Sequence, residues 1–306
     1  MMWRAYNLED DMVQRTRAFL IATLLLASAT VALAQQPRYR FSVVASGLDR
    51  PVGITVEGSE TVYFTLVPTP GVGGGANGVA KLDLETGAIT MLHVGEPEPT
   101  NIVIDNQGDL YWTCKSAGVI LKQTEEGATS RFLGGLEQPS GIAVSKRGNV
   151  YFTEIPHPGV PGAGNRVSVT DGNTKVVLHQ GEPEPTDIVV SRNGSLYWTC
   201  KSAGVILRRV NGETSVLVAG LNHPVGIALD HKGETLYFTE VPTPGVPGSA
   251  GGQNRVNALD LATKTVRVIH EGDPEPTDVA VARNGNVYWT CTSAGVIVEA
   301  RRIGRR

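Results

Sequence analysis

Carboxylates recur at regular positions along this chain. The string Glu-Pro-Glu-Pro-Thr begins at Glu96 and again at Glu182, and Asp-Pro-Glu-Pro-Thr begins at Asp273. The second acid of each copy stands directly before a proline, and these acids are Glu98, Glu184 and Glu275. Carboxylates brought close together raise one another's pKa unless a cation lies among them. The set therefore predicts either a hydrated, solvated opening or a site for a hard cation such as Ca²⁺ or Mg²⁺.

A second string, Pro-x-Gly-Ile, alternates with these acidic strings along the chain. The residues directly before the prolines of both kinds are, in chain order, Arg50, Glu98, Gln138, Glu184, His223 and Glu275. Two residues after each proline the chain has Gly53, Asn101, Gly141, Asp187, Gly226 and Asp278. We expect the first set to bind a ligand, and we add Asp187 and Asp278 to the three glutamates as candidate metal ligands.

The elements that must position these residues are short strands. Tyr-Phe-Thr and Tyr-Trp-Thr-Cys alternate along the chain, each between runs rich in Val, Ile and Thr that end in Gly-containing turns. This pattern is typical of strands and hairpins. With four strands in about 45 residues, six units fill residues 36–306, which predicts an all-β, six-bladed β-propeller of four-stranded antiparallel sheets.

Ring closure also follows from the strand pattern. The last unit has only three strands, and a spare strand, Arg40–Ala45, precedes the first unit. Pairing the spare strand with the last sheet closes the ring and covers an exposed edge. We therefore expect one propeller over residues 35–306, made of three double-blade repeats at approximately 49–137, 138–222 and 223–303.

Pro-x-Gly-Ile-Ala-Val, a Gly turn, Val-Tyr-Phe-Thr-Glu and Asn-Arg-Val together resemble the NHL-repeat propellers. More broadly, residues 38–303 are similar to the TolB-like superfamily, which holds gluconolactonase-like enzymes and, more distantly, the streptogramin B lyases. In such propellers the loop entering the innermost strand and the loop between the second and third strands share one face. The resemblance therefore implies that the acidic strings share a looped face with three proline-rich segments: Val67–Ala76, Ile155–Gly164 and Val241–Gly252.

The resemblance can be compared with this chain residue by residue. Gluconolactonase-like enzymes hold their metal with Asn or Asp between the Pro and Gly of the inner strand. The chain has only apolar or hydroxyl side chains there, namely Val52, Thr100, Ser140, Thr186, Val225 and Thr277, so that metal site does not carry over. The related lyases use a histidine with glutamates and Mg²⁺, which makes His179, His270 and Glu184 candidates for catalysis. Local hydrogen bonding that shapes the entry loop is the favoured role of the histidines.

Other repeated residues have structural and functional interpretations. Glu154 and Glu240 end Tyr-Phe-Thr strands and are candidates for ligand binding, although the first copy has Leu66. We expect Arg166 and Arg255 to pair with a neighbouring glutamate, with anion binding as the alternative. The repeated tryptophans and cysteines are interpreted as core residues between blades: Trp112, Trp198, Trp289, Cys114, Cys200 and Cys291.

The first residues are expected to direct export. Arg15 and Arg17 precede the apolar run Ala18–Ala34, which ends in Ala-Leu-Ala, as in a secretory signal peptide over residues 1–34. The run is short for a membrane span, so we expect no anchor after cleavage and a periplasmic or extracellular protein. A net charge of −3 argues against nucleic-acid binding.

The sequence leaves two main functions as alternatives. One is a secreted module that binds a small ligand or a partner protein through the looped face, without catalysis. The alternative is a divalent-metal-dependent hydrolase, lactonase-like, or a lyase with its site at the axial opening. A third is a structural subunit that assembles through its loops. Near-identity of the three double blades favours the first, because a catalytic site usually breaks a repeat.

Overall fold

Six antiparallel sheets of four strands form the described part of the chain, residues 37–68, 76–156, 164–181, 183–242 and 254–303. The expected signal peptide over 1–34 and most of the three proline-rich segments lie outside these residues. Residues Arg40–Arg301 form one unit; of the other, Met1–Tyr39 and Arg302–Arg306, only 37–39 and 302–303 are described. No helix that meets the length and hydropathy of a membrane span occurs in the described ranges.

The first five sheets each use four consecutive strands from the innermost to the outermost, and the sixth takes β1 as its outermost strand. The first three sheets contain β2 (Pro51–Glu57), β3 (Thr61–Leu66), β4 (Gly78–Asp83) and β5 (Ile89–Val94); β6 (Pro99–Ile104), β7 (Leu110–Cys114), β8 (Val119–Gln123) and β9 (Thr129–Leu133); β10 (Pro139–Val144), β11 (Val150–Glu154), β12 (Arg166–Thr170) and β13 (Lys175–Gln180). The next two contain β14 (Pro185–Val190), β15 (Leu196–Cys200), β16 (Val205–Val210) and β17 (Glu213–Ala219); β18 (Pro224–Leu229), β19 (Thr235–Glu240), β20 (Arg255–Asp260) and β21 (Val266–Glu271). The sixth contains β22 (Pro276–Val281), β23 (Val287–Cys291), β24 (Val296–Ile303) and β1 (Arg38–Ala45).

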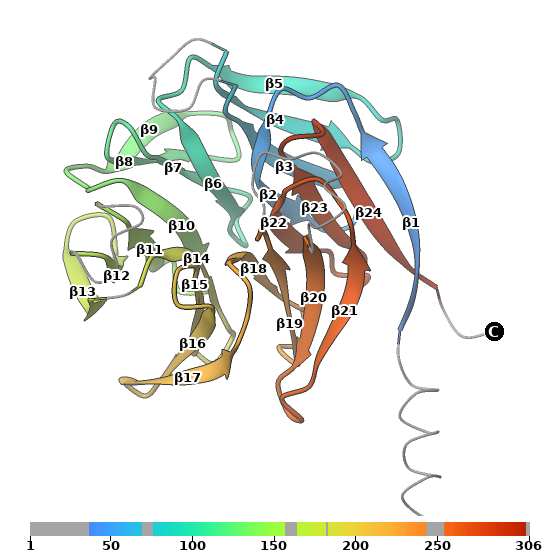
Figure 1. Ribbon diagram of the computed structural model, residues 1–306. Helices are drawn as coiled ribbons and strands as arrows, with labels where there is room; N and C mark the ends of the chain where they lie inside the picture. Colours follow the sequence, from blue (N-terminus) through green and yellow to red (C-terminus); the bar gives the residue numbers. More distant parts are fainter. Residues whose placement is uncertain (1–36, 69–75, 157–163, 182, 243–253, 304–306) are drawn as a thin grey trace, which may run out of the picture. The chain divides into compact units, whose positions relative to one another are not determined.

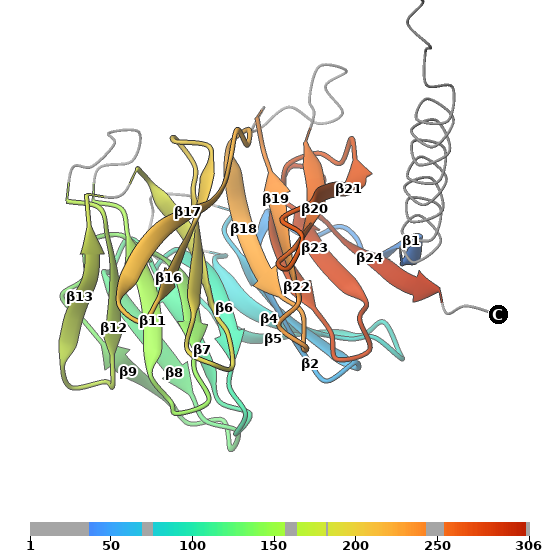
Figure 2. The same cartoon turned by 90° about the horizontal axis from the view of Figure 1, so that it is seen from below.

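The six sheets surround one axis, with β2, β6, β10, β14, β18 and β22 innermost (Figure 1). The side view shows β18 to β21 standing beside one another (Figure 2). In the sixth sheet β1 pairs with β24, so the predicted closure by a strand from the start of the propeller is confirmed. Buried Glu299 of β24 accepts hydrogen bonds from Ser42 of β1 (3.4 Å) and from Tyr288 (2.8 Å).

The core lies between neighbouring sheets. Trp198, for example, packs with Ala143 and Val167 of the third sheet and with Ile188 of its own. All three repeated tryptophans are fully buried, and so are the three cysteines. The interpretation of both sets as core residues is therefore confirmed.

Candidate functional site

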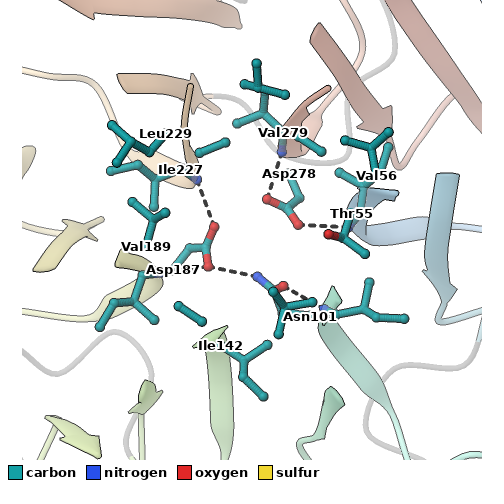
Figure 3. Close-up of a pocket in the computed structure, with 18 of the residues that line it drawn as sticks. Thr55, Val56, Asn101, Ile142, Asp187, Val189, Ile227, Leu229, Asp278 and Val279 are labelled. Carbon is teal, nitrogen blue, oxygen red and sulfur yellow. Dashed lines mark hydrogen bonds between the residues drawn. The ribbon is translucent and has the colours of Figure 1, made fainter. Parts of the chain in front are cut away.

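A narrow cavity of about 180 Å³ follows the axis, lined by all six innermost strands. At one level three polar side chains from alternate sheets point toward one another in an otherwise apolar lining (Figure 3). We call these residues, Asn101, Asp187 and Asp278, the axial cluster. Each is at least nine-tenths buried.

The axial cluster joins neighbouring sheets through its hydrogen bonds. Oδ2 of Asp187 accepts from the backbone N–H of Ile227 (2.8 Å), and Oδ2 of Asp278 accepts from that of Ile54 (2.9 Å). The Oδ1 atom of each aspartate accepts from the backbone N–H of the residue that follows it, at 2.7 Å. Asn101 differs, because its Nδ2 donates to Oδ1 of Asp187 at 2.9 Å (Figure 3).

Glycine alternates with the axial cluster for a steric reason. A Cβ atom added at Gly141 would lie 2.5 Å from Cα of Asp187, and one at Gly226 would lie 2.6 Å from Cα of Asp278. Real Cβ atoms do not approach so closely, so the odd sheets must have glycine where the even sheets have Asn or Asp.

Burial changes the protonation of the two axial aspartates. Burial raises the pKa of Asp187 to about 7, although hydrogen bonds from Ile227, Ile188 and Asn101 lower it. Burial first, and then the charge of Asp187, raises the pKa of Asp278 well above its ordinary value. The pair therefore retains a proton near neutral pH, because two carboxylates this deeply buried cannot both ionise cheaply.

A ring of six threonines supports the same level of the axis, one from the second strand of each sheet. They are Thr65, Thr113, Thr153, Thr199, Thr239 and Thr290, all fully buried. Each hydroxyl accepts a hydrogen bond of 2.8–3.2 Å from the inner-strand residue two after the proline. Thr199 also donates to the carbonyl of Val225 in the next sheet at 2.6 Å. The sequence repeats this threonine six times, and that repetition is the signal from which the ring could have been predicted.

The six residues before the inner-strand prolines share an uncommon backbone conformation. All are left-handed, with φ between 49 and 59°. They are Arg50, Glu98, Gln138, Glu184, His223 and Glu275, and we call them the mouth. Each carbonyl accepts a hydrogen bond of 3.0–3.2 Å from the first residue after the second strand, for example from Lys201 to Glu184. The entry loop and the loop after the second strand therefore lie at one end of each sheet, as the topology of related propellers implies.

The side chains of the mouth differ in exposure. Arg50 and His223 are exposed, Gln138, Glu184 and Glu275 are half-buried, and Glu98 is buried. The hydroxyl of Ser293 donates to Glu275, and Nε of Arg50 donates to the carbonyl of Val67 at 3.2 Å. The mouth thus presents three carboxylates, one guanidinium, one amide and one imidazole at equivalent places of six sheets.

A larger cavity lies beside the mouth, between the second and third sheets. It encloses about 610 Å³ and is lined by Gln138 of the mouth together with Lys115, Glu137 and Pro156. Pockets of about 300–1,000 Å³ are the usual size for a small ligand.

Glu154 and Glu240, the other predicted ligand-binding residues, are buried within their own sheets. Glu154 accepts from Nε of Arg166 at 2.8 Å and from the backbone N–H of Glu137 at 3.0 Å. Hydrogen bonds from Arg166 and Glu137, with the charge of Lys175, hold the pKa of Glu154 below its ordinary value although burial opposes this. Glu240 accepts from the backbone N–H of Asn222 at 2.6 Å. Both carboxylates thus fix the entry loop of the mouth, and the expected pairing of Arg166 is confirmed.

The histidines lie on outermost strands, His179 on β13 and His270 on β21, whereas Glu184 precedes innermost β14. His270 packs on Trp289, with ring centroids 5.6 Å apart, and its Nε2 lies 3.1 Å from Oδ1 of Asp273 in the next entry loop. That hydrogen bond raises the pKa of His270. The structure therefore does not bring the three candidate catalytic residues together, and His270 makes the loop-shaping contact that the sequence favoured.

Ca²⁺ or Mg²⁺ would need oxygen donors that are not already engaged. Every carboxylate oxygen of Asp187 and Asp278 accepts a hydrogen bond from within the propeller. Among the described residues, no group of three or more His, Cys, Asp or Glu side chains is arranged to hold a metal ion. The axial carboxylates are thus engaged within the propeller, and a metal role for Asp187, Asp278, Glu98, Glu184 and Glu275 stays a prediction.

Comparison with known proteins supports the fold. No protein-family model matches the sequence, and no curated protein does. A streptogramin B lyase is 19% identical, with a TM-score of 0.62 over 87% of this chain and 98% of that one. The chain shares the propeller fold of this lyase. A gluconolactonase from Xanthomonas campestris is 15% identical (TM-score 0.67, 87% and 90% covered), and a chain of a nidogen/laminin complex is 21% identical (TM-score 0.59, 72% and 80% covered).

Proposed function

We propose that the protein is an exported binding module that holds a small ligand or a segment of a partner protein at the mouth, without catalysis. The observation that carries this proposal is the left-handed backbone of all six mouth residues. An L-residue in this conformation costs about 1–2 kcal/mol, and glycine avoids that cost. Twenty glycines take positive φ elsewhere in the described residues, yet none occupies the mouth. Six side chains are retained where glycine would fit the backbone better, as is common at functional sites.

The cavity beside Gln138 gives the ligand a place adjacent to the mouth. The mouth carries one guanidinium and three carboxylates, so it suits a ligand that offers hydroxyl or amino groups. Export rests on the signal peptide expected over residues 1–34. The alternative of a lactonase-like hydrolase or lyase would need a metal at the mouth glutamates.

A thermal-shift screen of neutral sugars, amines and lactones tests the proposal. We expect compounds that raise the melting temperature of the wild-type protein and fail to do so in Glu184→Gln or Gln138→Leu. Arg147→Gln, on an exposed turn at the other end of the third sheet, is the matched control and keeps the response. Lactone hydrolysis that requires both added Mg²⁺ and Glu184 would overturn the proposal in favour of the enzyme.

A further inference from the structure

The end of the propeller opposite the mouth has an uneven distribution of charge. In each sheet a tight turn joins the first strand to the second. At one equivalent position of this turn the six sheets have Gly58, Asn106, Lys146, Arg192, His231 and Arg283. Basic side chains thus occupy this position in four successive sheets, and the first two sheets have none there. Acids flank the position in the first, second and fifth sheets: Glu57, Glu60, Asp105, Asp109, Asp230 and Glu234.

Two of these basic side chains, from the fourth and fifth sheets, are in contact. Nη2 of Arg192 lies 2.7 Å from Nε2 of His231, a contact that needs a neutral imidazole to accept the hydrogen bond. Desolvation and then the charges of Arg192, Arg283 and Lys146 lower the pKa of His231, and Asp230 opposes them. All four basic side chains are exposed, and none of them forms an ion pair with an acidic residue in the described part of the chain.

Two cavities open between the fourth and fifth sheets at this end. One of about 320 Å³ is lined by Arg192, His231 and Lys232, and one of about 450 Å³ by Arg208 and Lys264. Both are lined by Asn193, Tyr197 and Gly233. We call the two cavities together the turn-side groove.

Two details indicate an anionic occupant for the turn-side groove. Nε of Arg208 is buried and has no hydrogen-bond acceptor among the described residues. Three carboxylates also line the groove: Asp230, Glu234 and Asp260. Oδ1 of Asp230 accepts from the backbone N–H of Glu234 at 2.7 Å, and Oδ1 of Asp260 accepts from that of Thr263 at 2.8 Å. Among the described residues, none of the three forms an ion pair with Arg192, Arg208 or His231.

We propose that the turn-side groove binds a phosphate-bearing ligand, with Arg192 and Arg208 as the principal donors and His231 as a donor once protonated. Guanidinium groups match the geometry of phosphate oxygens and form charge-assisted hydrogen bonds with them. The phosphate can belong to a soluble ester or to a lipid headgroup in a membrane surface, and the same groups would recognise either.

Calorimetry with glycerol 3-phosphate and co-sedimentation with phosphatidylglycerol vesicles separate the two sources. Binding of the soluble ester identifies a free ligand, and binding of vesicles alone identifies a headgroup. In either case Arg192→Gln should weaken binding about tenfold, the value of one charge-assisted hydrogen bond. Arg147→Gln removes the same charge from the same end outside the groove, so it should change affinity less than twofold, as exposed charges do at moderate salt.

The pH dependence gives a second readout. Ligand phosphate favours the protonated form of His231. A phosphate monoester itself gains a proton at about pH 6, so His231→Asn is measured at both pH values to account for the titration of the ligand. The affinity of the wild-type protein relative to that of His231→Asn should be higher at pH 5.5 than at pH 8. For Arg208→Gln both the affinity and the melting temperature are measured. Arg208 is partly buried, so the melting temperature distinguishes a loss of binding from a loss of folding. Absence of binding in both assays, or an equal loss in Arg147→Gln and Arg192→Gln, would overturn the proposal. Either result leaves the mouth proposal intact, since the two sites lie at opposite ends.

Discussion

At the scale of the residue, the mouth shows what a sequence pattern can and cannot indicate. The repeated prolines were enough to identify all six mouth residues as equivalent positions. Their left-handed φ was not predictable, because glutamate, arginine and glutamine, which occupy five of the six positions, do not mark this conformation. The proton retained between Asp187 and Asp278 was equally hidden, since it depends on burial by strands far apart in the chain.

Replacing a mouth residue by glycine should relieve backbone strain. His223 is exposed and has φ of 51°, so His223→Gly should leave the free energy of unfolding unchanged or raise it by up to about 1 kcal/mol. Its neighbour Asn222 is also exposed and lacks positive φ, so Asn222→Gly should lower it by about 0.5–1 kcal/mol. Urea denaturation of both variants and of the wild-type protein measures these free energies of unfolding. A larger loss in His223→Gly than in Asn222→Gly would contradict the strain argument.

The axial cluster predicts that stability falls as pH rises. Burial raises the pKa of Asp187 and Asp278 above their values in the unfolded chain. The folded state therefore holds more protons than the unfolded state between about pH 4 and pH 7, so the free energy of unfolding contributed by the pair declines across that interval.

Asn101 limits the free-energy cost of burying an ionised Asp187, because its amide donates a hydrogen bond to Asp187 without adding a charge. Asn101→Asp should lower the free energy of unfolding by about 3 kcal/mol at pH 8 and by clearly less at pH 5, where the added carboxyl is protonated. Denaturation at the two pH values measures the difference, with Asn284→Asp on an exposed turn as the control. An equal loss at both pH values would argue against a shared proton in the axial cluster.

At the scale of the element, strands are joined by hydroxyl groups as well as by apolar packing. Each inner-ring threonine bonds to the first strand of its own sheet, and Thr113, Thr199 and Thr290 also reach a carbonyl of the next sheet. The strand positions were predictable from the Tyr-x-Thr strings. The hydrogen bonds between sheets were not predictable, because a repeated string does not indicate which residue of the next sheet a side chain will contact.

Removing one bridge should therefore destabilise the propeller without leaving a cavity. Thr199→Val keeps the shape of the side chain but leaves the backbone N–H of Asp187 and the carbonyl of Val225 without this partner. The free energy of unfolding should fall by about 1–3 kcal/mol. Thr90→Val on exposed β5 is the control and should change it by less than about 0.5 kcal/mol. Equal values for the two variants would show that the bridge adds no stability.

At the scale of the whole molecule, closure determines which residues meet. The count of sheets and the pairing of β1 with β24 were predictable because the repeat and its missing last strand are written in the sequence. Closure places the three even sheets so that Asn101, Asp187 and Asp278 share one level of the axis (Figure 3). It also keeps the outer-strand histidines away from Glu184, which precedes an innermost strand.

The proposed function requires that the mouth binds its ligand without a metal ion. Metal analysis of the purified protein, together with melting in Ca²⁺, Mg²⁺, Mn²⁺ or chelator, measures this requirement. We expect metal far below one ion per chain and an unchanged melting temperature in all four conditions. One tightly bound ion per chain that disappears in Glu184→Gln would contradict it, as would a rise of several degrees, the size expected from a saturating ligand worth about 2–3 kcal/mol.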